Sequence, residues 1–147
     1  MDTEKEAKKT KFNLKSIVGV VIGFFIASMG FNYLVKNSTV DEQLSKAASN
    51  LNKNLPMMVD SETRWDSTVA LPDKTLKYFY TLVNYSKDEL DINKTGNTIR
   101  PLMLNNIRTS SDMELFRRNK VTMIYSYRDK DHNEVMELKF THDDYKE

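Results

Sequence analysis

The stretch RWDSTVALPDKTLKYFYTLVN, residues 64–84, indicates the fold class of the globular part of this chain. Apolar and polar side chains alternate in both of its halves with a period of two, which is typical of β-strands with one buried face. Pro72-Asp73-Lys74 lies between the halves as a turn, so the stretch predicts a β-hairpin of strands 64–71 and 76–84. The positions expected to share one face are Trp65, Ser67, Val69 and Leu71 in the first strand and Tyr78, Tyr80 and Leu82 in the second.

A second hairpin is predicted at the end of the chain, where residues 121–127 and 136–140 alternate in the same way around the polar turn 129–133. Phe79 and Ile124 have the opposite register to the tyrosines beside them, so they are expected on the other face of the sheet. Aromatic and apolar side chains on exposed faces often anchor protein partners. The predicted interaction patch comprises Phe79, Val83, Ile124 and Val135. The alternative is that a helix or a loop covers these side chains.

Helices are predicted from capping boxes, in which a hydroxyl and a carboxylate three residues apart bind the first free amides of a helix. The box Thr39–Glu42 begins a helix that Pro56 ends. Between the hairpins, helices are expected over 87–94, 99–108 and 112–119, with Gly96 separating the first two and Pro101 opening the second. This order predicts an α+β domain: an antiparallel sheet of two β-hairpins, with helices between them and one helix before them. The expected core contains Trp65, Leu82, Phe116, Leu138 and Phe140.

The stretch SIVGVVIGFFIASMGFNYLV, residues 16–35, contains no charged residue, whereas 29% of the whole chain is charged. About nineteen helical residues extend ~28 Å, close to the hydrocarbon thickness of a membrane. Apolar side chains point all round this helix, which argues against a core helix of a small domain. The remaining alternative is a signal peptide cleaved near Gly30, but the apolar run continues through Val35 and favours an uncleaved transmembrane helix.

Basic residues set the orientation of this predicted span, because Lys and Arg are retained on the cytoplasmic side. Five lysines precede it and two basic residues lie in the fifteen positions after it, so the N-terminus is expected inside. The predicted organisation is a cytoplasmic tail (1–15), a transmembrane anchor (16–35) and an extracytoplasmic α+β domain (36–147) in the bacterial inner membrane. Gly19, Gly23 and Ala27 are spaced by four, a pattern that favours helix pairing in lipid, either in a homodimer or with a partner's span.

Composition excludes several function classes for the domain. Five of the 22 Lys and Arg residues and three of the 21 Asp and Glu residues precede Lys36, so the remaining 112 residues carry 17 basic and 18 acidic side chains. That balance argues against nucleic acid as a partner, since phosphate backbones require a basic excess. There is no cysteine, which excludes disulfides, thiolate nucleophiles and cysteine zinc sites.

Two patterns in the sequence contain residue types that bind metals or act in catalysis. The run Asp129–Asn133 begins like a calcium loop, but the sixth position holds Glu134 instead of Gly and the twelfth holds Phe140 instead of Glu, so a hairpin turn is expected. His132 and His142, with Asp143 or Asp144, would form a three-ligand metal site if two loops converged. No spacing supports that convergence. We therefore expect no cofactor, no metal and no enzymatic activity.

The stretches LPMMVDSETRWDSTVALPDKTLKYFYTLVNYS and LMLNNIRTSSDMELFRRNKVTMIYSYRDKD resemble a family of small uncharacterised bacterial proteins that are exported or membrane-anchored. The resemblance covers about residues 55–140 and implies an envelope location. Relatives in this family carry a cysteine after the Asn-Asn pair and another near the C-terminus, which implies a disulfide. This chain has Arg108 and Tyr145 near those positions, so the bridge is lost.

Two functions follow as hypotheses. The first is a membrane-tethered, non-enzymatic binding or adaptor module that docks on another envelope protein, for assembly, regulation or immunity, because tethering raises the effective concentration near a target. The alternative is an extracytoplasmic hydrolase or metal-dependent enzyme that uses His132 and His142.

Overall fold

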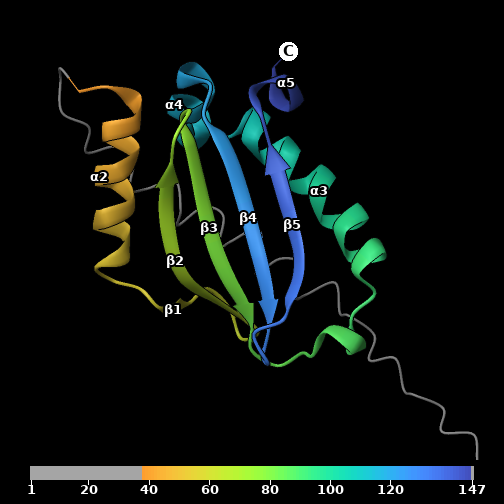
Figure 1. The fold of residues 1–147 in the computed structure, drawn as a ribbon. Helices are drawn as coiled ribbons and strands as arrows, with labels where there is room; N and C mark the ends of the chain where they lie inside the picture. The colour runs from red at the N-terminus through yellow and green to blue at the C-terminus, as the bar shows by residue number, and fades with distance from the viewer. Residues whose placement is uncertain (1–37, 147) are drawn as a thin grey trace, which may run out of the picture.

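The computed structural model describes residues 38–146, which form an α+β domain with a five-stranded sheet (Figure 1). The span predicted for residues 16–35, with Gly19, Gly23 and Ala27, lies outside these residues. Within them, no helix combines the length and the apolar character that crossing a membrane requires. The elements are α2 (Val40–Asn52), β1 (Met57–Met58), β2 (Thr63–Leu71), β3 (Thr75–Leu82), η2 (Lys87–Glu89), α3 (Ile92–Thr109), η3 (Ser111–Met113), α4 (Glu114–Asn119), β4 (Thr122–Asp129), β5 (Glu134–Phe140) and α5 (His142–Tyr145).

Both predicted hairpins are confirmed, but the prediction of a wholly antiparallel sheet is wrong. The strand order is β1-β2-β3-β4-β5, and the central pair, β3 and β4, is parallel. Thr75 at the start of β3 lies opposite Thr122 at the start of β4. A parallel pair needs a crossover connection, which residues 83–121 supply. The eighteen residues of α3 extend ~27 Å, about the length of the eight-residue strand β3, so the helix returns the chain to the end where β3 began.

Helix α3 is longer than the sequence pattern predicted. Gly96 and Pro101 lie inside it and neither begins nor ends a helix, which corrects both predictions. Pro101 has no N–H to donate to the carbonyl four residues earlier. Packing overrides this cost, because the helix buries one continuous face that begins before Gly96 and extends beyond Pro101. The buried side chains of that face follow at intervals of four: Thr95, Ile99, Met103 and Ile107.

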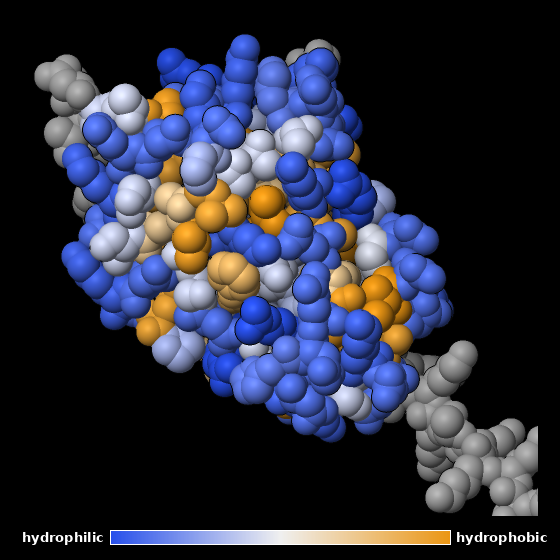
Figure 2. Space-filling model, in the orientation of Figure 1, coloured by the Kyte–Doolittle hydropathy of each residue, from blue (hydrophilic) through white to orange (hydrophobic). Residues whose placement is uncertain are grey.

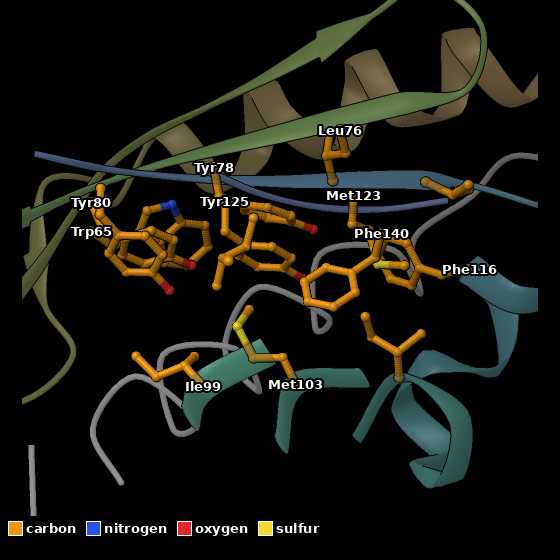
Figure 3. Close-up of a cluster of buried hydrophobic side chains, with 14 of the residues drawn as sticks. Trp65, Leu76, Tyr78, Tyr80, Ile99, Met103, Phe116, Met123, Tyr125 and Phe140 are labelled. Carbon is orange, nitrogen blue, oxygen red and sulfur yellow. The ribbon is translucent and has the colours of Figure 1, made fainter. Parts of the chain in front are cut away.

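The core lies between α3 and one face of the sheet and contains a cluster of aromatic rings (Figure 3). Tyr78 and Tyr125 stack across the parallel pair with ring centroids 4.9 Å apart, and Tyr80 stacks on Tyr127 at 5.2 Å. Ile99 and Met103 face this cluster from α3 (Figure 3). The predicted core is confirmed, because all five of its side chains are buried: Trp65, Leu82, Phe116, Leu138 and Phe140.

Helix α2 begins as predicted and lies along the edge of β2 (Figure 1). Thr39 and Glu42 form the expected reciprocal capping box. Leu44, Ala47 and Ala48 are its buried residues and join the same core. At the other end of the helix, the side chain of Asn52 hydrogen-bonds to the backbone of β2 at Thr68. The free edge of the sheet is therefore covered at this position.

Candidate functional site

The face of the sheet opposite the core carries no helix in the described part of the chain. In Figure 1, α4 lies behind the strands, α3 runs from behind the upper end of β5 out to its side, and α2 lies beside β2. We call the uncovered side the open face. Space filling shows apolar side chains over the middle of this face, surrounded by hydrophilic ones (Figure 2). An apolar centre with a polar border is the usual composition of a protein interface.

A β-bulge in β2 determines which side chains reach the open face. The pairing shifts between Trp65 and Ser67, so Asp66 is the extra residue of the bulge. Beyond it, Thr68 is buried, whereas Val69 and Leu71 are 41% and 37% exposed. The prediction of one shared face is therefore wrong. Trp65 lies on the core face, whereas Ser67, Val69 and Leu71 lie on the open face. One inserted residue reverses the face of every residue that follows.

The predicted patch divides between the two sides of the sheet. Phe79 and Ile124 are half-buried and alternate with the core tyrosines of their strands, so both lie on the open face as expected. Val83 is half-buried just beyond the end of β3. Val135 belongs to the buried core cluster, because the pairing shifts between Tyr127 and Arg128 and leaves it as an extra residue in β5. The sequence gives no sign of this second bulge.

The apolar side chains of the open face therefore differ from the predicted set. We call them the apolar stripe, which crosses β2, β3 and β4. The stripe consists of Leu71, Val69, Phe79 and Ile124.

Cations flank Phe79 at the centre of this stripe. The ammonium of Lys77 lies 5.2 Å from the centroid of the Phe79 ring, and the guanidinium carbon of Arg128 lies 6.0 Å from it. Lys77 is paired with Glu137 across the sheet at 2.7 Å, whereas no ion pair of Arg128 is found among the described residues. Both cations are within the range of cation–π attraction. Arg128 therefore supplies the unpaired positive charge beside the ring.

A shallow hollow lies beside the ring. Its volume is about 280 Å³, and it is lined by Asp66, Ser67, Phe79 and Arg128. The bulge residue Asp66 is held by Arg64 and by the hydroxyl of Thr81, so its carboxylate is already satisfied. Arg128 is therefore the charged group of this hollow that is available to an incoming side chain. The hollow is suited to contact with a protein surface, since an aromatic ring and an available guanidinium lie side by side in its lining.

The two histidines do not converge. His132 lies in the β4–β5 turn with a φ of 67°, and His142 follows the other end of β5, so the length of a strand, ~23 Å, separates them. Among residues 38–146, no three His, Asp or Glu side chains gather as metal ligands would. The metal-site hypothesis built on this pair is therefore wrong in its geometry.

Asp129 organises the β4–β5 turn, as the hairpin interpretation of the calcium-like run predicted. Its carboxylate accepts hydrogen bonds from the backbone N–H groups of Lys87, Asp131 and Asn133 at 2.8–2.9 Å, and from the Asn133 side chain at 3.1 Å. Burial disfavours the charged form, but these hydrogen bonds outweigh it and hold the pKa of Asp129 below its ordinary value. Both carboxylate oxygens are thus used to fix the turn.

Comparison with known proteins identifies the family and the fold. Residues 38–137 match the family described as domain of unknown function DUF8479. A comparison with curated protein sequences gave no significant match. Three solved structures share the fold. The first is a Pseudomonas aeruginosa protein provisionally assigned as secreted, with a TM-score of 0.57 and 12% identity over 74% of this chain and 98% of that one.

The other two similar structures are pilotins of type II secretion systems. The pilotin AspS of Vibrio cholerae has a TM-score of 0.53 and 10% identity, covering 71% of this chain and 91% of its own. The pilotin EpsS of Vibrio vulnificus has a TM-score of 0.54 and 8% identity, covering 74% of this chain and 93% of its own. At these low identities the three structures show a shared fold, that is, a similar arrangement of strands and helices.

Proposed function

The chain belongs to the DUF8479 family, and we propose that this member is a membrane-tethered, non-enzymatic adaptor of the bacterial envelope. Its domain docks on another envelope protein through the open face of the sheet. The observation that carries the proposal is the apolar stripe, with Phe79 at its centre and Arg128 beside it. Val69 and Leu71 are exposed beside Phe79 and Ile124 on one face, and a contiguous apolar patch with a polar border is typical of a surface that a protein partner covers.

The shared fold supports the class of function. Two of the similar structures are pilotins of type II secretion systems, and the fold is therefore compatible with work inside a multi-protein assembly. This support is an analogy between folds, because one fold serves many functions. The site-level support comes from the open face alone.

The tether is the second part of the proposal. Residues 16–35 anchor the chain in the inner membrane, with residues 1–15 inside and the domain 36–147 outside, because the lysines precede the apolar run. A reporter enzyme that works only outside the cytoplasm, fused after Glu147, is expected to be active. An inactive fusion, or a mature N-terminus near Phe31, would contradict the tether and leave the docking face untouched.

The small residues of the anchor give it a surface for pairing. Gly19, Gly23 and Ala27 leave a groove along one side of the helix, where a second copy or the span of a partner can approach closely. Gly23→Ile fills that groove and keeps the helix hydrophobic. We expect the substitution to reduce self-association of the full chain in membranes. Unchanged association would leave a partner's span as the remaining occupant.

The docking face is tested by chemical crosslinking of the full chain in native membranes, followed by identification of the trapped protein. Phe79→Ser removes the centre of the stripe, and Leu102→Ser is the matched control, since Leu102 is 46% exposed on α3, outside the sheet. We expect the yield of one specific adduct to fall with Phe79→Ser and to persist with Leu102→Ser. Equal yields from both variants would contradict docking through the open face.

A further inference from the structure

A second hollow, of about 360 Å³, lies at the end of the domain where α3 finishes and α4 and α5 meet. Its lining is Arg108, Arg117, His142, Tyr145 and Lys146. Three of the five residues are cations, and no carboxylate is among them. A lining with three cations and no carboxylate attracts anions.

The two arginines are held in place by neutral groups, so their charge is not cancelled. Arg117 Nη1 donates to the carbonyls of Ile107 and Ser110 at 2.6 and 2.7 Å, and Arg108 Nη2 donates to the carbonyl of Asp144 at 2.6 Å. Within residues 38–146, neither guanidinium has a carboxylate within 4.0 Å. Hydrogen bonds to backbone carbonyls orient both groups while they keep their full positive charge and further N–H donors.

The acidic groups near the hollow are engaged elsewhere. The Asp144 carboxylate accepts from the backbone and the hydroxyl of Thr141 and pairs with Arg100 at 3.1 Å. Hydrogen bonds from Thr141 and the charge of Arg100 lower the pKa of Asp144, and Asp144 is not among the residues that line the hollow. Asp143 pairs with Lys146 at 2.6 Å on the surface, where both side chains are more than half exposed. An exposed pair of this kind exchanges readily for another anion, because its net stability is small.

Direct contacts place the hollow at the same end of the domain as the first turn of α2. Asp41 accepts from the Lys74 N–H, the Lys74 carbonyl accepts from the Thr122 N–H, and the Tyr145 hydroxyl donates to the carbonyl of Val121. In Figure 1, α4, α5 and the start of α2 are all at the upper end of the domain. The segment that leads from the proposed tether therefore enters the domain at the end that carries the hollow.

We infer that this hollow binds a phosphate group, with Arg108, Arg117 and Lys146 as its ligands. A guanidinium pair and an ammonium match the charge and the several acceptor oxygens of a phosphate. The phosphate belongs either to an acidic lipid headgroup or to a soluble phosphorylated molecule. The site goes beyond the proposed docking function, and only the lipid source rests on the proposed tether.

The test is a calorimetric titration of inorganic phosphate into the full chain, held in phosphatidylcholine nanodiscs at low and constant ionic strength. We expect saturable binding that Arg108→Gln and Lys146→Gln each weaken about tenfold, the value of one charge-assisted hydrogen bond. Lys146→Gln keeps the test decisive if Arg108→Gln destabilises the α3–α5 contact, since the Lys146 side chain lies at the surface. Arg118→Gln is the control, because this α4 side chain is 71% exposed and does not line the hollow.

Absence of saturable phosphate binding by the unaltered chain would overturn the inference, and so would an equal loss in Arg118→Gln. A second titration in nanodiscs that also contain phosphatidylglycerol separates the two sources. If a lipid headgroup occupies the hollow, the apparent phosphate affinity falls in these nanodiscs. If the ligand is soluble, the affinity is the same in both. Either result supports the phosphate site and identifies the source of the phosphate. Both titrations would be unchanged if the open face had no protein partner, so failure of the docking proposal is distinguishable from failure of this one.

Discussion

The side-chain amide of Asn52 takes the place of a neighbouring strand for Thr68: its Oδ1 accepts from the Thr68 N–H and its Nδ2 donates to the Thr68 carbonyl, both at 2.8 Å. β1 pairs with β2 only at Trp65 and Arg64, so the edge of β2 beyond them would otherwise present unpaired backbone groups. Uncovered strand edges pair with other chains and cause aggregation. One side chain at the end of α2 thus fixes the helix to the sheet and blocks an edge.

Asn52→Ala removes both hydrogen bonds and is expected to lower the free energy of unfolding by about 1–2 kcal/mol. Chemical denaturation of the full chain in detergent measures the change. Asn54→Ala is the matched control, since Asn54 is exposed just after the helix, and its effect should stay within about 0.5 kcal/mol. A similar effect for both variants would show that the Asn52 contact contributes no stability.

Loss of the hydroxyl group is expected to change the stability of the domain differently at two buried tyrosines. The Tyr80 hydroxyl is buried and has no hydrogen-bond partner among residues 38–146, so Tyr80→Phe should leave the stability unchanged or raise it by up to about 1 kcal/mol. The Tyr145 hydroxyl donates to the Val121 carbonyl at 2.8 Å, so Tyr145→Phe should cost about 0.5–1.5 kcal/mol. Thermal denaturation ranks the two variants, and the reverse ranking would refute this assignment of the hydroxyls.

The turn at Asp129 predicts a pH dependence of stability. Its pKa is lower in the folded chain than in the unfolded chain, where it is about 3.9, so the folded state binds fewer protons at this group. The stabilisation is therefore complete above about pH 5 and is lost as the pH falls through the folded pKa. Asp129→Asn should lower the melting temperature at pH 7, and the gap to the unaltered chain should narrow below about pH 4.

Asp131→Asn is the control for this titration, because the Asp131 side chain is exposed in the same turn. Its melting temperature should follow that of the unaltered chain at every pH. A gap between Asp129→Asn and the unaltered chain that stays constant from pH 7 to pH 3 would contradict the role of the charged carboxylate.

Most of the fold could be predicted because its signals are local. The capping box at Thr39 and Glu42 and the alternation in both hairpins depend on neighbouring residues, and both were predicted correctly. Tertiary packing decides the rest. The single helix through Gly96 and Pro101 forms because its buried face fits the aromatic core, and the parallel pairing of β3 and β4 follows from that helix.

The candidate site was only partly predictable, for two physical reasons. A bulge shifts the faces of a strand by one inserted residue, and no pattern marked Asp66 or Val135 as that residue, so Val69 and Leu71 were expected on the buried face. Phe79 and Ile124 lie in regular parts of their strands and were placed correctly. The basic hollow was missed, because Arg108, Arg117 and Lys146 come together only through packing of α3, α4 and α5.

The central claim, that the open face is the docking surface, is tested most directly by a photo-crosslinking amino acid placed singly in the full chain in native membranes. Phe79, Ile124 and Val69 report on the apolar stripe, and Leu102 on α3 and Lys53 after α2 are the control positions. We predict that the three stripe positions trap the same envelope protein and that the two controls do not. Capture of that protein equally from Leu102 and Lys53, or no adduct from any stripe position, would contradict the account.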